Sequence, residues 1–160
     1  MKNNELIEGS ELVFYEYDKL RQTYEMLNEF KSKRPPVEKP LRVAVLESWI
    51  IHFRCLYYFL NPQRTDKREF ILKDFLSEKE IEEFTSAFEK WQDREYWKDK
   101  ADTQLSHISK KRLEYNKNTR RKSWNYDIPN QKIIELFHDF LKLANNENLC
   151  PDLIKIKASI

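Results

Sequence analysis

Two histidines, each followed closely by an arginine, are the residues of this chain best suited to acid–base chemistry on a phosphate. His52 lies in the apolar run 41–60 with Arg54 two residues later, and His107 lies in a polar stretch with Arg112 five residues later. A neutral histidine can deprotonate a ribose 2′-hydroxyl, and an arginine can stabilise the charge that develops on the phosphate. One hypothesis is therefore metal-independent RNA cleavage that leaves a cyclic phosphate. His107 would be the base, His52 the acid, and Arg54 or Arg112 the phosphate clamp, provided that the two segments meet.

A second interpretation of the same residues is structural. A histidine in an apolar helix is commonly satisfied by one hydrogen bond to a backbone group or a carboxylate. His52 and Arg54 would then belong to a polar network that fixes helix register, and Arg112 would pair with Glu47 or Asp102. The protein would be a non-catalytic helical module that binds RNA or a protein partner. His138, which precedes an aspartate, is predicted to form an ordinary exposed pair with it.

Metal and nucleotide chemistry have little support in the sequence. The chain has three histidines and two cysteines, without an HExxH or CxxC motif, and a metal-binding bundle would need His52, His107 and carboxylates to converge. Its one glycine rules out a glycine-rich phosphate loop. We therefore predict no metal and no cofactor.

A basic stretch follows His107. Residues 110–122 hold seven lysines and arginines against one glutamate, a net charge of +6, and aromatic residues lie within and beside them. Cations that contact phosphates, interleaved with aromatic rings that stack on bases, are typical of single-stranded RNA binding. The alternative is a solvated loop that balances residues 69–102, which hold 11 acidic and 6 basic residues. The predicted RNA-binding residues are Lys110, Lys111, Arg120, Arg121, Lys122 and Trp124.

The elements that must position these residues are helices. A single glycine in 160 residues argues against sheets and tight hairpins, while 40% hydrophobic and 35% charged residues allow both a core and a solvated surface. We predict an all-α antiparallel bundle of four to five helices. It would be one domain, 1–160, with its core at about 10–145 and a C-terminal tail at 146–160. The expected helices are 11–31 with Ser10 as N-cap, 41–60 through the centre, 77–91 opened by a Ser77–Glu80 capping box, 93–115, and 128–143 opened by Ile128-Pro129. Segments 61–76 and 146–160 are left unassigned.

The predicted location is the cytoplasm. Two cysteines are too few for a disulfide framework, and Cys55 is expected to be an inert core thiol. The first residues do not resemble a signal peptide. Arg42, Glu47, His52 and Arg54 interrupt the run 41–60, so we expect a core helix and no membrane contact.

Taken together, these motifs resemble a group of uncharacterised bacterial helical proteins. Those proteins carry histidine-x-arginine in one helix. In another they carry alanine or serine, then histidine, then leucine or isoleucine, then serine or threonine, with an arginine three residues further on. Here the matching segments are His52-Phe53-Arg54 and Ser106-His107-Ile108-Ser109-Lys110-Lys111-Arg112, and Trp124 follows in the next loop.

More remotely, the arrangement resembles the HEPN superfamily of four-helix-bundle proteins. The resemblance implies a ribonuclease or RNA-binding protein of a toxin–antitoxin or phage-defence type, acting as a homodimer or with a cognate protein partner. Only His107 carries over directly. The superfamily's arginine, four to six residues before the histidine, is replaced here by Asp102, Ala101 and Lys100. Lys100, His52, Arg54 or Arg112 would have to supply the positive charge.

Overall fold

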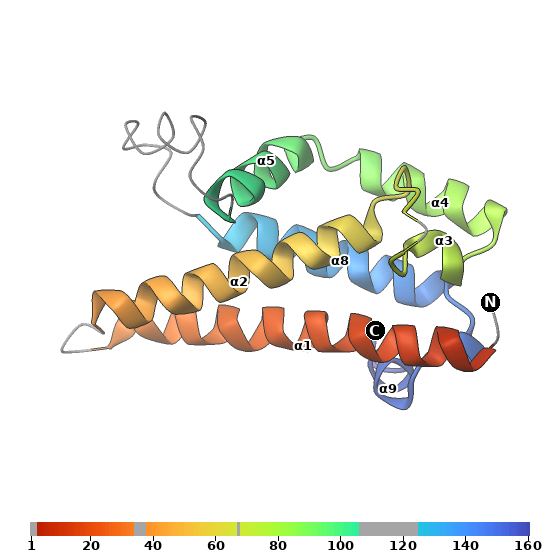
Figure 1. The fold of residues 1–160 in the computed structure, drawn as a ribbon, viewed down its shortest axis with the longest axis horizontal. Coiled ribbons are helices and arrows are strands. Elements are labelled where there is room, and N and C mark those ends of the chain that lie inside the picture. The colour runs from red at the N-terminus through yellow and green to blue at the C-terminus, as the bar shows by residue number, and fades with distance from the viewer. Residues whose placement is uncertain (1–2, 34–37, 67, 106–124) are drawn as a thin grey trace.

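The fold is a bundle of helices, seen in a computed structural model that describes residues 3–33, 38–66, 68–105 and 125–160. Every regular element among these residues is helical, which confirms the all-α prediction (Figure 1). In chain order the elements are α1 (Asn3–Ser32), α2 (Lys39–Leu60), α3 (Leu72–Phe75), α4 (Glu78–Glu89), α5 (Arg94–Leu105), α8 (Asp127–Leu143), the 3₁₀ helix η1 (Asn146–Asn148) and α9 (Pro151–Lys157).

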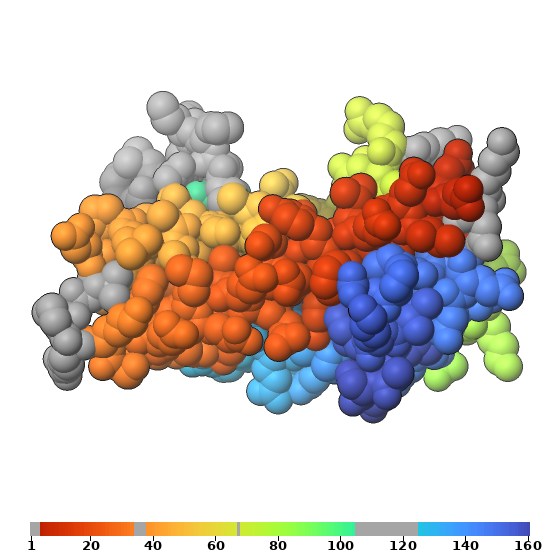
Figure 2. All heavy atoms as spheres, turned by 90° about the horizontal axis from the view of Figure 1, so that it is seen from below, coloured from red at the N-terminus to blue at the C-terminus, as the bar shows by residue number. Residues whose placement is uncertain are grey.

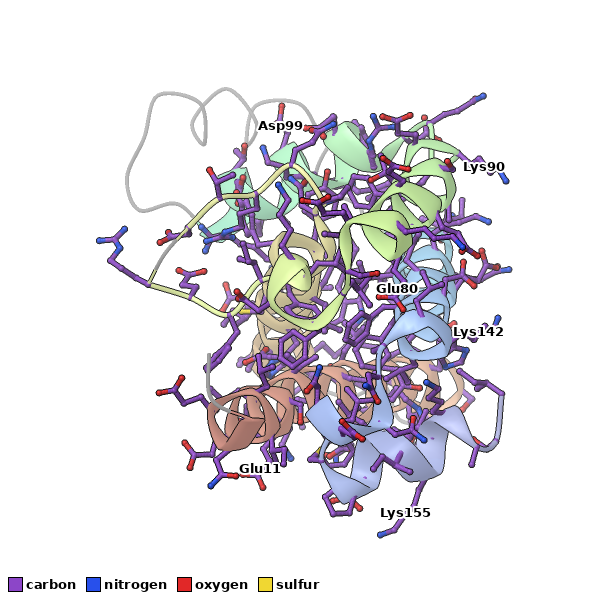
Figure 3. The ribbon with its side chains drawn as sticks, turned by 90° about the vertical axis from the view of Figure 1, so that its right-hand side faces the viewer. Glu11, Glu80, Lys90, Asp99, Lys142 and Lys155 are labelled. Atoms are coloured by element: carbon purple, nitrogen blue, oxygen red, sulfur yellow. The ribbon has the colours of Figure 1, made fainter. Side chains whose placement is uncertain are left out.

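Helices α1 and α2 form a long antiparallel hairpin on one side of the bundle (Figure 1). Helices α4 and α5 follow one another along the opposite side, separated by a break between Glu89 and Arg94, and α8 runs antiparallel to them. Seen from one end, these helices surround the interior, and the labelled charged side chains Glu11, Lys90 and Lys155 lie on the outside (Figure 3). The order is therefore up, down, up, down, with α4 and α5 together serving as the third helix.

Helix α2 lies at the centre because it is apolar on most of its faces. Trp49, Phe53 and Tyr57 recur every four residues, so they share one face, and each is fully buried. The Trp49 indole donates from Nε1 to Oδ1 of Asn130 on α8 over 3.1 Å, and its ring stacks on Phe53 at a centroid distance of 5.2 Å. These aromatic contacts join the hairpin to the rest of the bundle.

The prediction for the start of the first helix was wrong. Helix α1 begins at Asn3, and Ser10 lies inside it, 1% exposed. Its hydroxyl donates to the carbonyl of Ile7 and accepts the backbone N–H of Cys150 over 2.7 Å. Ser10 is thus a polar contact between α1 and the C-terminal residues, which lie beside α1 in Figure 2.

The unassigned C-terminal segment belongs to the core. It forms η1 and α9, and both pack on α1. Leu149, Cys150 and Leu153 are buried, so the apolar interior extends past the predicted limit near residue 145. Burial of these apolar side chains stabilises the helical structure of the tail. This stabilisation depends on contacts with α1, so the local sequence pattern does not predict it.

Two contacts position the segment between α2 and α4, one within the segment's own end and one with α1. The predicted capping box is confirmed: the backbone N–H of Ser77 donates to Glu80 over 2.7 Å, and the Ser77 hydroxyl caps the first turn of α4. Before it, α3 is a single helical turn. Phe70, just ahead of α3, lies directly against Gly9 of α1, where a Cβ atom would stand 2.6 Å from the phenyl ring.

Helix α2 is long and apolar enough, by length and composition alone, to cross a membrane. Core helices of soluble proteins meet the same criterion, and 44% of its most apolar window is buried inside the bundle.

Candidate functional site

His52 faces α1 and is held there by a carboxylate. Its Nδ1 donates to Oε2 of Glu16 over 2.7 Å, and the edge of its ring meets Tyr15 at a centroid distance of 5.9 Å. The His52 side chain is 11% exposed and that of Glu16 is 27% exposed. A buried imidazole with a charged acceptor is satisfied, so this contact fixes the register of α2 against α1.

Arg54 faces α5 instead. Its Nε donates to Oδ1 of Asp102 over 2.6 Å, while the Tyr58 hydroxyl donates to Oδ2 of the same aspartate over 2.7 Å. The guanidinium also lies 5.3 Å from the Tyr58 ring centroid. Partial burial opposes the charge, but the hydrogen bond and charge of Asp102 outweigh it and raise the pKa of Arg54.

His52 and Arg54 point away from one another. Two residues along a helix correspond to a rotation of about 200°, which places the two side chains on nearly opposite faces of α2. Each is already joined to a carboxylate on a different helix, Glu16 on α1 and Asp102 on α5. These pairs join α2 to α1 and to α5, and a part for either residue in a site with His107 stays a prediction.

The other predicted site residues lie outside the described part of the chain. They are His107, Arg112, Lys110, Lys111, Arg120, Arg121, Lys122 and Trp124. Whether His107 approaches His52, Arg54 or Arg112 thus stays a prediction.

Lys100, one of the residues that the sequence offered as a source of positive charge near His107, is described and is 4% exposed. Its Nζ lies 5.6 Å from the ring centroid of Tyr96 and 5.2 Å from that of Trp97. Burial lowers its pKa. Its ammonium group is therefore enclosed by aromatic rings of its own helix.

The outer face of the hairpin carries a site that the sequence did not reveal. We call it the hairpin groove and define it by Leu12, Tyr15 and Glu16 of α1 with Ile51 and Cys55 of α2. Leu12 is 61% exposed, Tyr15 51% and Ile51 45%. The α1 and α2 sides of the groove are in contact, because Glu16 binds His52 and Tyr15 packs on the same imidazole.

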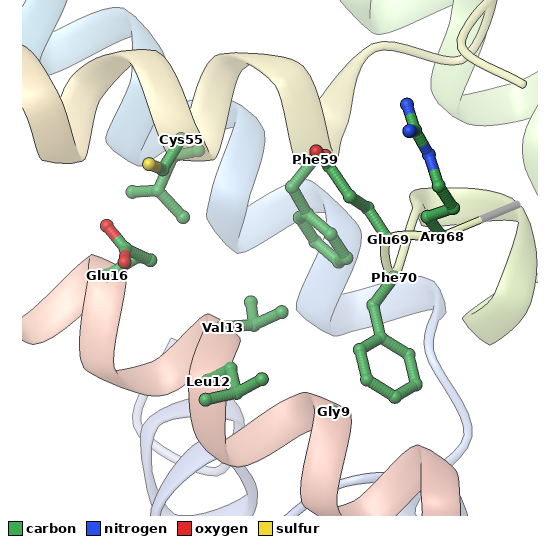
Figure 4. Close-up of a pocket in the computed structure, with 10 residues that line it drawn as sticks. Gly9, Leu12, Val13, Glu16, Cys55, Phe59, Arg68, Glu69 and Phe70 are labelled. Atoms are coloured by element: carbon green, nitrogen blue, oxygen red, sulfur yellow. The ribbon is translucent and has the colours of Figure 1, made fainter. Parts of the chain in front are cut away.

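A cavity of about 420 Å³ opens at one end of the hairpin groove (Figure 4). Its walls are mostly apolar, and Phe70 closes the end that lies over Gly9. The Glu16 carboxylate points toward the Cys55 thiol at the other end, and the Arg68 side chain points away from the space. The residues that line it are Gly9, Leu12, Val13, Glu16, Cys55, Leu56, Phe59, Arg68, Glu69 and Phe70.

Cys55 is exposed, so its expected place in the core was wrong. It sits on the outer edge of α2, next to the cavity. Partial burial, followed by the charge and hydrogen bond of Glu16, raises the pKa of the thiol to about 11. The thiol is therefore neutral near pH 7 and a poor nucleophile.

His138 also differs from expectation. It is half-buried, with Nε2 3.2 Å from the Tyr17 hydroxyl, and Asp139 pairs with Lys142 instead. Burial, and then the nearby Lys142 charge, lower the pKa of His138. Over the residues with defined positions, no group of three or more His, Cys, Asp or Glu side chains is arranged to hold a metal ion.

Comparison of the chain with protein-family models, curated proteins and solved structures finds no match.

Proposed function

We propose that this chain is a non-catalytic helical protein-interaction module, and that the hairpin groove is its docking surface. The observation that carries the proposal is that exposed apolar side chains of α1 and α2 lie next to one cavity, which Leu12 itself lines. Exposed apolar patches beside a concave site are typical of surfaces that bind other proteins, because covering them removes apolar area from water.

The ion pairs of α2 support the non-catalytic part of the proposal. His52 and Arg54 bind separate carboxylates on opposite sides of the helix. In this role they hold α1 and α5 in register around α2, so that the edges of the hairpin groove stay at a constant spacing. RNA cleavage with His107 as the base is the competing hypothesis, and RNA binding by the basic stretch at 110–122 stays a separate prediction from sequence.

The first experiment separates the module from a ribonuclease. We expect the purified chain to leave single-stranded RNA intact in the presence of a chelator. His52→Gln should lower the free energy of unfolding by about 2 kcal/mol, the scale of a hydrogen bond to a charged group. Arg54→Gln, whose pair is more exposed, should lower it by about 0.5 kcal/mol. Metal-independent cleavage that disappears in His107→Ala, with an unchanged urea midpoint, would overturn the proposal.

The second experiment tests the docking surface inside the cell. A photo-crosslinking phenylalanine analogue is placed at position 12 in one variant and at position 41 in another. Leu12 and Leu41 are both exposed, at 61% and 50%, but Leu41 lies in the first turn of α2, away from the cavity. We expect a discrete protein adduct from position 12 and none from position 41. Equal adducts from both positions, or none from position 12, would contradict the assignment.

A further inference from the structure

Carboxylates accompany the exposed apolar residues of the hairpin groove. Residues 3–18 of α1 contain five acidic residues and neither lysine nor arginine. Glu8 lies one helical turn before Leu12, and Glu11 lies one turn before Tyr15. Both glutamates are exposed. Leu12 therefore lies between the carboxylates of Glu8 and Glu16, one turn to either side. Tyr15 lies between Glu11 and Lys19, and the Lys19 ammonium is 5.8 Å from the Tyr15 ring centroid.

The second helix repeats the pattern. Glu47 of α2 is exposed and lies one turn before Ile51, the apolar residue on the other edge of the hairpin groove. All three strongly exposed apolar side chains of the groove thus follow a glutamate by four residues. A partner that covers the apolar side chains must also approach these three carboxylates, so cationic residues flanking its own apolar face would make it complementary.

The cavity also restricts the shape of a partner that covers the groove. It is continuous with the exposed face through Leu12 and Cys55, and its interior is lined chiefly by Val13, Leu56 and Phe59. Its volume of about 420 Å³ is in the range of pockets that hold compact apolar groups. One large apolar side chain inserted here would anchor whatever covers the groove.

We propose that the hairpin groove binds a basic amphipathic helix of a partner protein, with one aromatic or large aliphatic side chain of that helix inserted in the cavity. This inference rests on the proposed function and specifies its partner. The binding mode is that of a helix laid in a groove, with anchors spaced along one face.

A second copy of the chain is a poorer occupant. A two-fold interface apposes the same patch on both copies, so the carboxylates of Glu8, Glu11 and Glu47 would face the carboxylates of the other copy. Like charges brought together in a partly dehydrated interface oppose association, whereas lysines and arginines relieve the same charges.

The test uses the whole chain and synthetic helical peptides of about 15 residues, long enough to form a helix on binding. The first peptide carries leucines and one central phenylalanine on one face and lysines elsewhere. The second has glutamate at every lysine position, and the third has alanine in place of the phenylalanine. Binding is measured by titration and, independently, by the rate at which N-ethylmaleimide alkylates Cys55. Cys150 is buried, so Cys55 is the thiol expected to react, and the reaction is run at mildly alkaline pH because the raised pKa of Cys55 slows it.

We expect the basic peptide to bind and to slow alkylation of Cys55, with an affinity that falls as salt is added. The glutamate peptide should not bind, and loss of the phenylalanine should weaken binding roughly tenfold. Leu12→Gln should weaken binding by a similar factor, while the matched exposed variant Leu41→Gln should not change it.

Charge is tested with paired variants of equal net change. Glu8→Gln with Glu11→Gln should weaken binding roughly fivefold at low salt, and Glu82→Gln with Glu83→Gln, two exposed positions of α4, should leave it unchanged. Absence of binding, equal binding of the glutamate peptide, or equal effects of the two charge pairs overturns the inference. Self-association of the chain that protects Cys55 without peptide also overturns it. These outcomes leave the crosslinking result at position 12 standing, so failure of the inference is distinguishable from failure of the proposed function.

Discussion

The only glycine of the chain provides the sharpest test of the packing around the cavity. Gly9 lies in the interior of α1, where alanine stabilises a helix by about 1 kcal/mol relative to glycine. A Cβ at this position would stand 2.6 Å from Cδ1 and Cε1 of Phe70 and 2.8 Å from its Cγ. Ordinary carbon contacts are about 3.5 to 4.0 Å, so the phenyl ring must move by about 1 Å.

The cost of that movement outweighs the gain in helix propensity. Overpacking typically costs about 1 to 3 kcal/mol, and the Phe70 ring also contacts Phe75, at a ring-centroid distance of 6.3 Å. We expect Gly9→Ala to lower the free energy of unfolding by about 1 kcal/mol, taking a central packing cost of about 2 kcal/mol against the propensity gain of about 1 kcal/mol.

A double-mutant cycle measured by urea unfolding isolates the contact. With Phe70→Ala in place the obstruction is gone, so Gly9→Ala should stabilise the chain by about 1 kcal/mol. The sign of its effect therefore reverses between the two backgrounds, a coupling of about 2 kcal/mol. If Gly9→Ala stabilises both backgrounds equally, Phe70 does not rest on α1 and the closed end of the cavity is misplaced.

Two further predictions concern helix capping and pH. Ser77→Ala removes the hydroxyl cap of α4 and should lower the free energy of unfolding by about 1 kcal/mol, whereas Ser77→Asp should retain most of it; thermal melts of both variants decide this. The lowered pKa of His138 means that the unfolded chain binds a proton first, so stability is complete above about pH 6.5 and declines as pH falls below it. Urea midpoints at about pH 7.5 and pH 5.5 should differ less in His138→Gln than in the wild type, and an unchanged difference would refute the assignment.

Local sequence patterns predicted those structural features that depend only on residues close together in the chain. The capping box at Ser77 and Glu80 depends on a contact across three residues, and the central place of α2 follows from its apolar composition. The start of α1 did not follow from such patterns. Ser10 has a side chain suited to an N-cap, but its hydroxyl accepts a hydrogen bond from the backbone N–H of Cys150, 140 residues away.

The candidate site also combines features that the local sequence predicts with features that only tertiary contacts determine. Sequence alone identified His52 and Arg54 as polar groups in an apolar helix that needed partners. It could not identify those partners, because Glu16 lies 36 residues away and Asp102 lies 48 residues away. Cys55 was assigned to the core because its neighbours in the chain are apolar, although its own face of α2 points outward.

The sequence by itself determined that this chain forms helices, since one glycine, a capping box and helical periodicity are local properties that need no knowledge of the fold. The tertiary structure decided what its polar groups do. In the fold, His52 pairs with Glu16 of α1 and Arg54 pairs with Asp102 of α5. The fold also places exposed residues of two helices next to a cavity that Phe70 closes over Gly9. The physical reason is that a binding surface arises from side chains distant in the chain, and only the packing of α1 on α2 brings them to the same face.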